Sequence, residues 1–235
     1  SRPVPLAELR AASHALGCTL NDLFAAAAAG ALHAHLDQRA RRIPRVRAVV
    51  PVNLRRAEEV GTMGNRFGLV FLSLPVGVAD PMERLARVRR EMDRLKASCE
   101  AGVTFALLRA FGPLGKAAVT LAVRFLGWKA SVVFTDVPGP RETVYFCGVP
   151  LTGVMAWVPQ SGRLSVGISV LSYAGQVQVG IAADAGLVPD PGALVEAYQA
   201  ALRALVRGAR ERAGAGERQG ETVAAPPAVS AVLEV

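Results

Sequence analysis

The histidines are the first residues to consider for chemistry, because histidine is the commonest general base in enzymes. The sequence holds three of them: His14, His33 and His35. His33 and His35 are two residues apart in a predicted helix, a spacing that turns side chains about 200° away from each other. They therefore cannot bind one metal ion together. We predict that all three are ordinary surface or interface residues, and that the chain has no catalytic base and no metal site of its own.

Serine, glycine and cysteine patterns also fail to match common enzyme motifs. Gly167-Ile-Ser169 lacks the second glycine of a nucleophile elbow, and Gly148-Val-Pro-Leu-Thr-Gly153 lacks the lysine of a phosphate-binding loop. No dinucleotide-binding glycine motif is present, so we predict no cofactor. The cysteines are scattered along the chain, which excludes a disulfide framework and a zinc knuckle and predicts a reducing compartment; they are Cys18, Cys99 and Cys147.

Two loops beside apolar strands are the best candidates for a binding site. In the first, Gly64, Asn65 and Arg66 precede an apolar strand. This loop is either a strand-entry turn that needs positive φ, or a place where Asn65 or Arg66 binds a ligand carbonyl or phosphate. The second loop ends another apolar strand and is either a plain tight turn or a rigid support for a substrate. Its candidate residues are Thr135, Asp136, Pro138, Gly139 and Pro140.

Positive charge is the main bias of the composition, with 27 Lys and Arg against 19 Asp and Glu, a net charge of +8. Such a balance attracts nucleic acid, anionic lipid or small anions. Aromatic residues make up only 6% of the chain, and we see no RNA-binding aromatic strand, so we expect no nucleic-acid partner. The stretch Val103–Ser131 is basic and otherwise apolar. It is either a buried helix pair with a solvated basic edge or a membrane-surface element, whose basic residues are Arg109, Lys116, Arg124 and Lys129.

Apolar periodicity and turn residues predict an α/β domain with a mixed β-sheet packed by helices. Helices are predicted at Pro5–Leu16, Thr19–Asp37, Asp80–Ser98, Val103–Trp128 (broken at Gly112-Pro113) and Pro189–Arg207. Strands are predicted at Arg45–Asn53, Phe67–Leu74, Ala130–Thr135, Glu142–Cys147, Leu151–Val158, Leu164–Leu171 and Gln176–Ala182. Residues 1–207 form the predicted domain and residues 208–235 a flexible tail. No apolar run reaches the roughly 18–20 residues of a membrane span.

Six short motifs occur in an order that resembles the C-terminal domain of the bacterial wax ester synthase/diacylglycerol acyltransferase (WS/DGAT) family. They are Leu20-Asn-Asp22, Val50-Pro-Val-Asn-Leu-Arg55, Gly64-Asn-Arg-Phe-Gly68, Thr135-Asp-Val-Pro-Gly-Pro140, Trp157-Val-Pro-Gln-Ser-Gly162 and Leu171-Ser-Tyr-Ala-Gly175. The family's usual Ser-Asn-Val-Pro-Gly-Pro begins here with Thr135-Asp136. This departure keeps the turn but removes the asparagine amide.

The resemblance implies a fold like chloramphenicol acetyltransferase and the peptide-synthetase condensation domains, in which two similar halves enclose a tunnel. In the family, the N-terminal half carries His-His-x-x-x-Asp-Gly, whose second histidine deprotonates the acceptor hydroxyl for attack on acyl-CoA. That motif is absent here, and a complete member is about twice as long. The resemblance therefore implies a catalytic partner half, expected before Ser1, and predicts that this chain alone is inactive.

The implied reaction moves a fatty acyl group from acyl-CoA, a substrate rather than a cofactor, to diacylglycerol or a long-chain alcohol. Asn21 and Asp22 would have a structural or substrate-supporting role, while Asn65, Arg66 and the Pro138–Pro140 turn would lie near the cleft. The arginines between residues 39 and 47 are either a solvated cluster or a site for an acyl-CoA phosphate. We expect a cytoplasmic protein that is either free or peripheral on the inner membrane or on lipid inclusions. The alternative is a non-catalytic lipid- or partner-binding module of the same fold.

Overall fold

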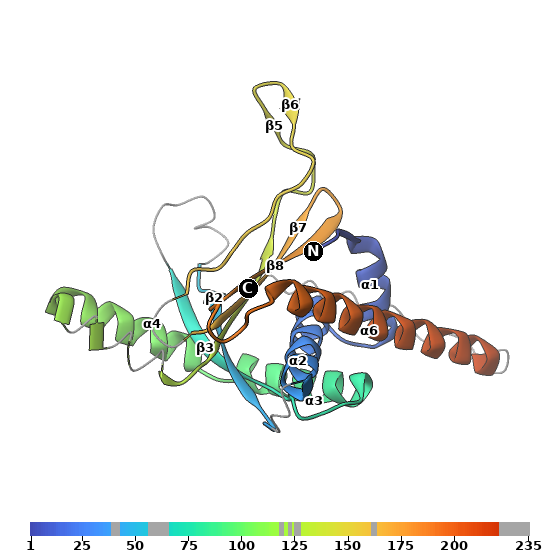
Figure 1. Cartoon of the computed structure of the whole chain (residues 1–235), viewed down its shortest axis with the longest axis horizontal. Helices are drawn as coiled ribbons and strands as arrows, with labels where there is room; N and C mark the ends of the chain where they lie inside the picture. The colour runs from blue at the N-terminus through green and yellow to red at the C-terminus, as the bar shows by residue number, and fades with distance from the viewer. Residues whose placement is uncertain are drawn as a thin grey trace.

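The chain folds around a mixed six-stranded sheet, which Figure 1 shows. The computed structural model describes residues 1–38, 43–55, 66–117, 120–121, 124, 128–160 and 164–220. The strand order is β1-β8-β7-β4-β2-β3. The strands are β1 (Val4–Pro5), β2 (Val46–Asn53), β3 (Phe67–Leu74), β4 (Val132–Pro138), β7 (Val166–Tyr173) and β8 (Gln176–Ala183). A small separate hairpin pairs β5 (Tyr145–Phe146) with β6 (Val149–Pro150). The predicted α/β class with a mixed sheet is confirmed.

Strands β2, β4 and β7 run parallel, while β3 and β8 are antiparallel to their neighbours. The last residues of the three parallel strands therefore meet the first residues of β3 and β8 at one edge of the sheet, which we call the carboxyl edge. Pairing between β4 and β7 continues from Val132 to Pro138. Pairing between β2 and β4 is confined to Ala48 and Val49 opposite Val132 and Val133. These two strands are therefore no longer hydrogen-bonded to each other toward the carboxyl edge.

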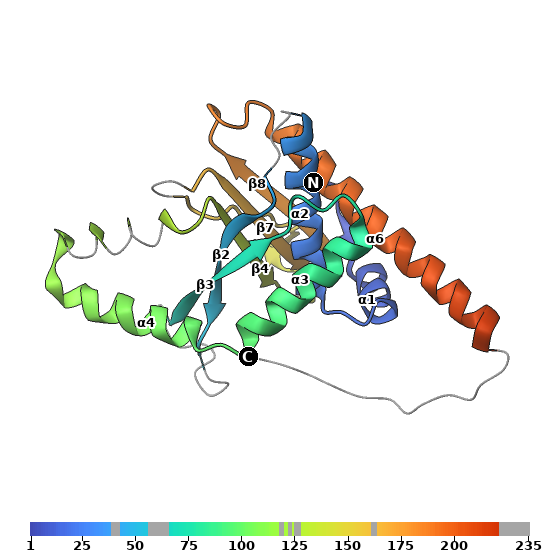
Figure 2. The same cartoon turned by 90° about the horizontal axis from the view of Figure 1, so that it is seen from below.

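One face of the sheet is covered by four helices, as Figure 2 shows. They are α1 (Leu6–Ala15), α2 (Leu20–Gln38), α3 (Pro81–Lys96) and α6 (Pro191–Gly220). Helix α2 lies in the middle of this layer, and its run Ala25–Ala29 is at most 1% exposed. Alanine favours the helix and its small side chain allows close packing on both sides. At Gly30 even a methyl group would not fit, because an added Cβ would lie 2.6 Å from Nη1 of the buried Arg84.

The edge strand β3 is protected by helix α4 (Glu100–Phe111), which extends away from the other helices (Figure 1). The Thr104 hydroxyl accepts a hydrogen bond from the Leu69 amide and donates one to the Leu69 carbonyl, both at 2.8 Å. Oε1 of Glu100 accepts a hydrogen bond from the Phe71 amide at 3.1 Å. These side chains satisfy backbone groups that an open sheet edge would offer to another chain. Helix α4 ends where the sequence predicts a break, at a 3₁₀ turn over Gly112–Leu114.

The segment Leu151–Val158 is not a strand, contrary to prediction, although Tyr145–Phe146 within the preceding predicted strand does form β5. This segment lies flat on the sheet face opposite the helices, where the Ser169 hydroxyl donates to the Ala156 carbonyl. Gly180 makes room for it, because an added Cβ there would lie 2.4 Å from the Ala156 oxygen. Apolar residues alternate in Leu151–Val158 because the segment packs on the sheet, although it is not one of the strands of the sheet.

Helix α6 continues to Gly220, past the predicted domain boundary at Arg207. Ala209 is 2% exposed, and Arg210 Nη2 forms an ion pair with Glu8 Oε1 at 2.7 Å. The packed domain thus includes part of the segment predicted as a tail; the rest of that segment, residues 221–235, lies outside the described residues. Among the described helices none is by itself long and apolar enough to cross a membrane, and α1 with α2 meets that test only as a pair bent by 95°.

Candidate functional site

The carboxyl edge brings together two of the sequence-predicted site segments. The turn Thr135–Pro140 continues β4 at this edge, and Arg66 stands immediately before β3. The Leu54 amide, just after β2, donates to the Arg66 carbonyl at 3.0 Å, which extends the β2–β3 pairing beyond Asn53 and Phe67. Gly64 and Asn65 lie outside the described residues. In an open sheet with parallel strands, ligands usually bind in the crevice outside the carboxyl ends of the strands.

The Thr135–Pro140 turn is fixed in place by the β7–β8 hairpin. The Gly139 amide donates to the Ser172 carbonyl at 2.9 Å, and the Pro140 carbonyl accepts from the Ala174 amide at 2.9 Å. An added Cβ at Gly139 would lie 2.3 Å from the Ser172 oxygen, a distance that real Cβ atoms do not reach. Glycine is therefore required there, and the turn is a rigid wall of the carboxyl edge.

Asp136 is the ionisable residue of this turn, and it is half-buried. Along β4 it shares the face of Phe134, which belongs to the core under the helices. Burial raises the pKa of the Asp136 carboxyl to about 6, against a smaller lowering by the Val137 amide. The pKa of the fully buried Tyr198 is raised by burial and also by Asp136, so the two side chains are neighbours. The Tyr198 hydroxyl donates to the Phe24 carbonyl of α2 at 3.2 Å, which connects the turn to the helix layer.

Asn21 and Asp22 stand in the first turn of α2, where Asp22 caps the helix. Its Oδ2 accepts from the Thr19 amide at 2.8 Å, and its own amide donates to Thr19 Oγ1 at 3.2 Å. This reciprocal pair is a capping box, and it gives Asp22 a structural role. Asn21 is exposed in the same turn. Burial and the Asp22 charge together raise the pKa of the Cys18 thiol to about 11, which keeps this thiol protonated and unreactive.

The histidines have positions that fit structural roles. His33 Nδ1 lies 2.7 Å from the Val76 carbonyl, and Val76 follows the end of β3 at the edge opposite the carboxyl edge. His14 is exposed in the last turn of α1, and His35 is half-buried near the end of α2. Over the described ranges, no three His, Cys, Asp or Glu side chains are grouped to hold a metal ion.

Tyr173 is a residue whose role sequence reasoning missed. Its buried hydroxyl donates to the Leu151 carbonyl at 2.8 Å and accepts from the Val144 amide at 2.9 Å. Val144 and Leu151 flank the β5–β6 hairpin, so Tyr173 clamps the base of that hairpin onto the end of β7. Figure 1 shows the hairpin standing well away from the sheet. The motif around Tyr173 was visible in the sequence, but its partners, more than twenty residues distant, were not.

The four predicted membrane-surface residues come from two different parts of the fold. Arg109, Lys116 and Arg124 are exposed along α4 and the stretch that follows it. Because the helix is interrupted at Gly112–Leu114, these three residues do not lie on one continuous helix. Lys129 lies elsewhere, with its Nζ 5.7 Å from the centre of the Phe71 ring on the sheet face opposite the four helices.

Comparison with known proteins supports the grouping of motifs found in the sequence. The family model "WS/DGAT C-terminal domain" matches residues 63–206. A protein named probable diacyglycerol O-acyltransferase tgs1 from Mycobacterium tuberculosis is 31% identical over 216 residues, covering 89% of this chain and 46% of that protein. Wax ester synthase/diacylglycerol acyltransferase 1 of Arabidopsis thaliana is 31% identical over 175 residues, covering 67% of this chain and 36% of that protein. The chain thus spans about half the length, or less, of these curated relatives.

Solved structures share the fold. The wax ester synthase/diacylglycerol acyltransferase from Marinobacter aquaeolei VT8 superposes with a TM-score of 0.63 at 24% identity, over 89% of this chain and 48% of that one. An epimerization domain of tyrocidine synthetase B superposes with a TM-score of 0.60 at 13% identity, over 90% and 48%. The mixed sheet with its helix layer is thus the fold that WS/DGAT enzymes share with condensation-type domains. Since the family model covers more than half of the residues, this chain belongs to the WS/DGAT C-terminal domain family.

Proposed function

We propose that this chain is the C-terminal half of an O-acyltransferase that moves a fatty acyl group from acyl-CoA to diacylglycerol or a long-chain alcohol. The observation that carries the proposal is the family match over residues 63–206, which includes the rigid Thr135–Pro140 turn at the carboxyl edge. Relatives named as acyltransferases support the reaction class. In this proposal the chain supplies one wall of the substrate tunnel, with the turn and Arg66 closest to it.

The catalytic base belongs to a partner half in this proposal. A histidine of His-His-x-x-x-Asp-Gly would take the proton of the acceptor hydroxyl while that oxygen attacks the thioester carbonyl carbon. The C–S bond would then break, and the leaving CoA thiolate would receive the proton. Two observations favour a base outside the chain: the His33 ring is engaged with the Val76 carbonyl, and the Cys18 thiol is held protonated by burial.

The β5–β6 hairpin is the surface that we assign to the partner half. Tyr145 is 65% exposed and Phe146 71% exposed, and Val149 beside them is also exposed. Aromatic side chains grouped on a projecting arm are typical of a surface that another protein covers. Tyr173 fixes the base of the arm, so its tip is presented in a defined direction.

A lipid surface is a second candidate partner, and helix α4 favours it. Val103 and Leu107 are each about half exposed on this helix, at 50% and 48%, and the exposed Arg109 and Lys116 follow them along the chain. An apolar helix face next to cations is suited to an anionic membrane surface. This candidate is compatible with the first, because a lipid-synthesising enzyme must meet its apolar substrates. Binding to phosphatidylglycerol vesicles that weakens with added salt would support it.

The decisive experiment measures thiol release from palmitoyl-CoA with diacylglycerol or hexadecanol as acceptor. This chain is assayed alone and then together with an N-terminal half that carries the His-His-x-x-x-Asp-Gly motif. We expect no turnover by the chain alone and turnover after recombination. Turnover by the chain alone would overturn the half-enzyme proposal, and the histidine whose replacement abolished it would be the base. A recombined pair that associates but stays inactive would instead favour a non-catalytic module.

A further inference from the structure

A groove lies on the sheet face opposite the four helices, at the edge opposite the carboxyl edge. It consists of two cavities of about 330 Å³ and 360 Å³ that share Arg45, Ser73 and Glu91 in their walls. Along β2 and β3, the residues of this face alternate with Val46, Leu72 and Leu74, which pack in the core. The groove therefore opens on this sheet face beside the edge strand β3, where residues of α3 from Glu83 to Arg94 and the start of α4 at Glu100 border it.

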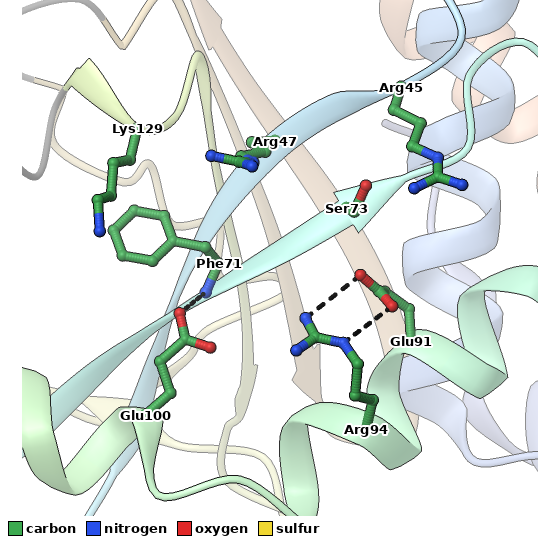
Figure 3. Close-up of a pocket in the computed structure, with 8 residues that line it drawn as sticks. All are labelled: Arg45, Arg47, Phe71, Ser73, Glu91, Arg94, Glu100 and Lys129. Carbon is green, nitrogen blue, oxygen red and sulfur yellow. Dashed lines mark hydrogen bonds and ion pairs between the residues drawn. The ribbon is translucent and has the colours of Figure 1, made fainter.

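The acidic side chains around the groove are already engaged. Glu91 is held by Arg94 of its own helix at 3.1 Å, and Glu83 by Arg87 at 2.5 Å. Glu100 accepts the hydrogen bond of the Phe71 amide at 3.1 Å, as the dashed lines in Figure 3 show together with the Glu91 pair. Glu83 and Glu91 are thus paired with arginines of α3, while the charge of Glu100 stays in the groove and offsets one of its other cations.

The groove wall also carries Arg45, Arg47 and Arg90, and the Lys129 ammonium group lies over the Phe71 ring. Figure 3 shows Arg47 beside Phe71 and Lys129, with Arg45 on the other side of the cavity, beyond Ser73. Within the described part of the chain, Arg45 and Arg47 form no side-chain hydrogen bond or ion pair, and both are exposed. The groove thus has a surplus of positive charge, supplied from β2, α3 and the segment before β4.

The chemistry of this surplus points to phosphate. A guanidinium group presents a planar fork of donors that matches two phosphate oxygens, and Ser73 adds a hydroxyl between the arginines. Two adjoining cavities suit a ligand that carries phosphate groups at two separated positions. Acyl-CoA has this character, because its nucleotide end carries a 3′-phosphate and a 5′-pyrophosphate. A headgroup of an anionic phospholipid shares the phosphoryl chemistry but carries it at one position.

We infer that this groove binds the phosphate-bearing nucleotide end of acyl-CoA, with Arg45 and Arg47 as its main contacts. The inference rests on the proposed acyl-CoA function and adds a subsite to it. Arg45 and Arg47 would lower the KM for acyl-CoA without touching the reacting thioester, because the groove lies at the edge opposite the Thr135–Pro140 turn.

The binding test uses adenosine 3′,5′-bisphosphate and the full chain in isothermal titration calorimetry at 50 mM salt. We expect binding that falls at least tenfold in the double variant Arg45→Glu/Arg47→Glu, and that weakens as salt increases. The matched control is Arg203→Glu/Arg207→Glu, which makes the same charge change at exposed positions of α6 and should alter binding less than twofold. Equal losses in both variants, or no binding by the unmodified chain, would overturn the inference.

Two further arms identify the ligand and separate this inference from the proposed function. If Arg45→Glu/Arg47→Glu lowers binding to phosphatidylglycerol vesicles but leaves bisphosphate binding unchanged, the groove serves a lipid headgroup and the inference is wrong. In the recombined enzyme, we expect the same variant to raise the KM for palmitoyl-CoA about tenfold with kcat unchanged. An active enzyme whose KM for palmitoyl-CoA is unchanged in the variant would overturn the inference about the groove and leave the proposed function standing. An inactive recombined enzyme would count against the proposed function. The titration with adenosine 3′,5′-bisphosphate would still decide whether the groove binds phosphate groups.

Discussion

At the scale of single residues, the Thr135–Pro140 turn owes its position to Gly139. We predict that Gly139→Ala lowers the free energy of unfolding by about 1–3 kcal/mol, because the new Cβ collides with the Ser172 carbonyl oxygen. Urea denaturation followed by circular dichroism measures this change. The control is Gly102→Ala in α4, where an added Cβ meets nothing within 4 Å and should be neutral or stabilising. If both variants unfold at the same urea concentration, the close approach at Gly139 is not a constraint.

Asp136 provides a pH-dependent prediction. Because burial raises its pKa in the folded chain to about 6, the native state binds more protons than the unfolded state between about pH 4 and pH 6. The contribution of Asp136 to stability therefore falls as pH rises through that window and stays low above it. The cost of the ionised form is on the order of 1–2 kcal/mol after allowance for partial exposure.

Replacing Asp136 by Asn should remove this cost. Asp136→Asn is expected to stabilise the chain by about 1–2 kcal/mol at pH 7.5 and by much less at pH 4, as measured by urea denaturation at both values. The replacement also restores the asparagine that the family resemblance leads one to expect at this position. Asp93→Asn, at an exposed position of α3, is the control for a general charge effect. A stability gain that is equal at the two pH values would show that ionisation of Asp136 is not its cause.

Sequence reasoning reached some of these residues and not others, for physical reasons. The turn residues were recognisable because glycine and proline restrict the backbone locally. The partners of Gly139, Tyr173 and Asp136 come from distant parts of the chain, and no local pattern encodes them. The arginines between residues 39 and 47 were recognisable in the sequence as one candidate phosphate site, but the groove was not, since Arg45, Glu91 and Lys129 meet only after the sheet and α3 have packed.

At the scale of elements, the helices and long strands followed from periodicity, while the segments that cross the sheet face did not. The strand β3 was predicted with its observed bounds, Phe67–Leu74, because both ends carry turn residues and its interior is apolar. Leu151–Val158 was wrongly predicted as a strand, since a segment that lies on a sheet also alternates its buried side chains. The spacing of apolar residues indicates which side chains are buried, but it does not indicate which groups the backbone forms hydrogen bonds with.

The β5–β6 hairpin depends on one hydroxyl, which gives a prediction at this scale. Tyr173→Phe removes the hydrogen bonds to the Leu151 carbonyl and from the Val144 amide. We expect a loss of about 1–2 kcal/mol in stability and faster amide hydrogen exchange across residues 141–155. The matched control is Tyr145→Phe, which removes an exposed hydroxyl on the same hairpin. Exchange that is unchanged in Tyr173→Phe would mean that the hairpin is held by other contacts.

At the scale of the whole molecule, the sheet is covered by helices on one face, while the opposite face is only partly covered by residues 151–160. The chain spans about half the length of its curated relatives, and two strongly exposed aromatic side chains, Tyr145 and Phe146, lie on the projecting hairpin. An acyltransferase with an apolar product must keep water from its thioester, which one open half cannot do. In the proposed enzyme, a partner half that covers the exposed hairpin would also exclude water from the thioester.

This requirement leads to a prediction about association. Asp residues in place of Tyr145 and Phe146 should weaken binding to the N-terminal half at least tenfold, because charged side chains would replace apolar contacts at the arm's tip. The stability of the isolated chain should be unchanged, since both positions are exposed there, at 65% and 71%. Size-exclusion chromatography with light scattering measures the association, and thermal unfolding of the isolated chain checks its fold. Leu187→Asp, at another exposed apolar position (55%), should leave association intact. Undiminished association in the Tyr145/Phe146 variant, with loss in Leu187→Asp, would move the partner surface away from the hairpin to the end of β8.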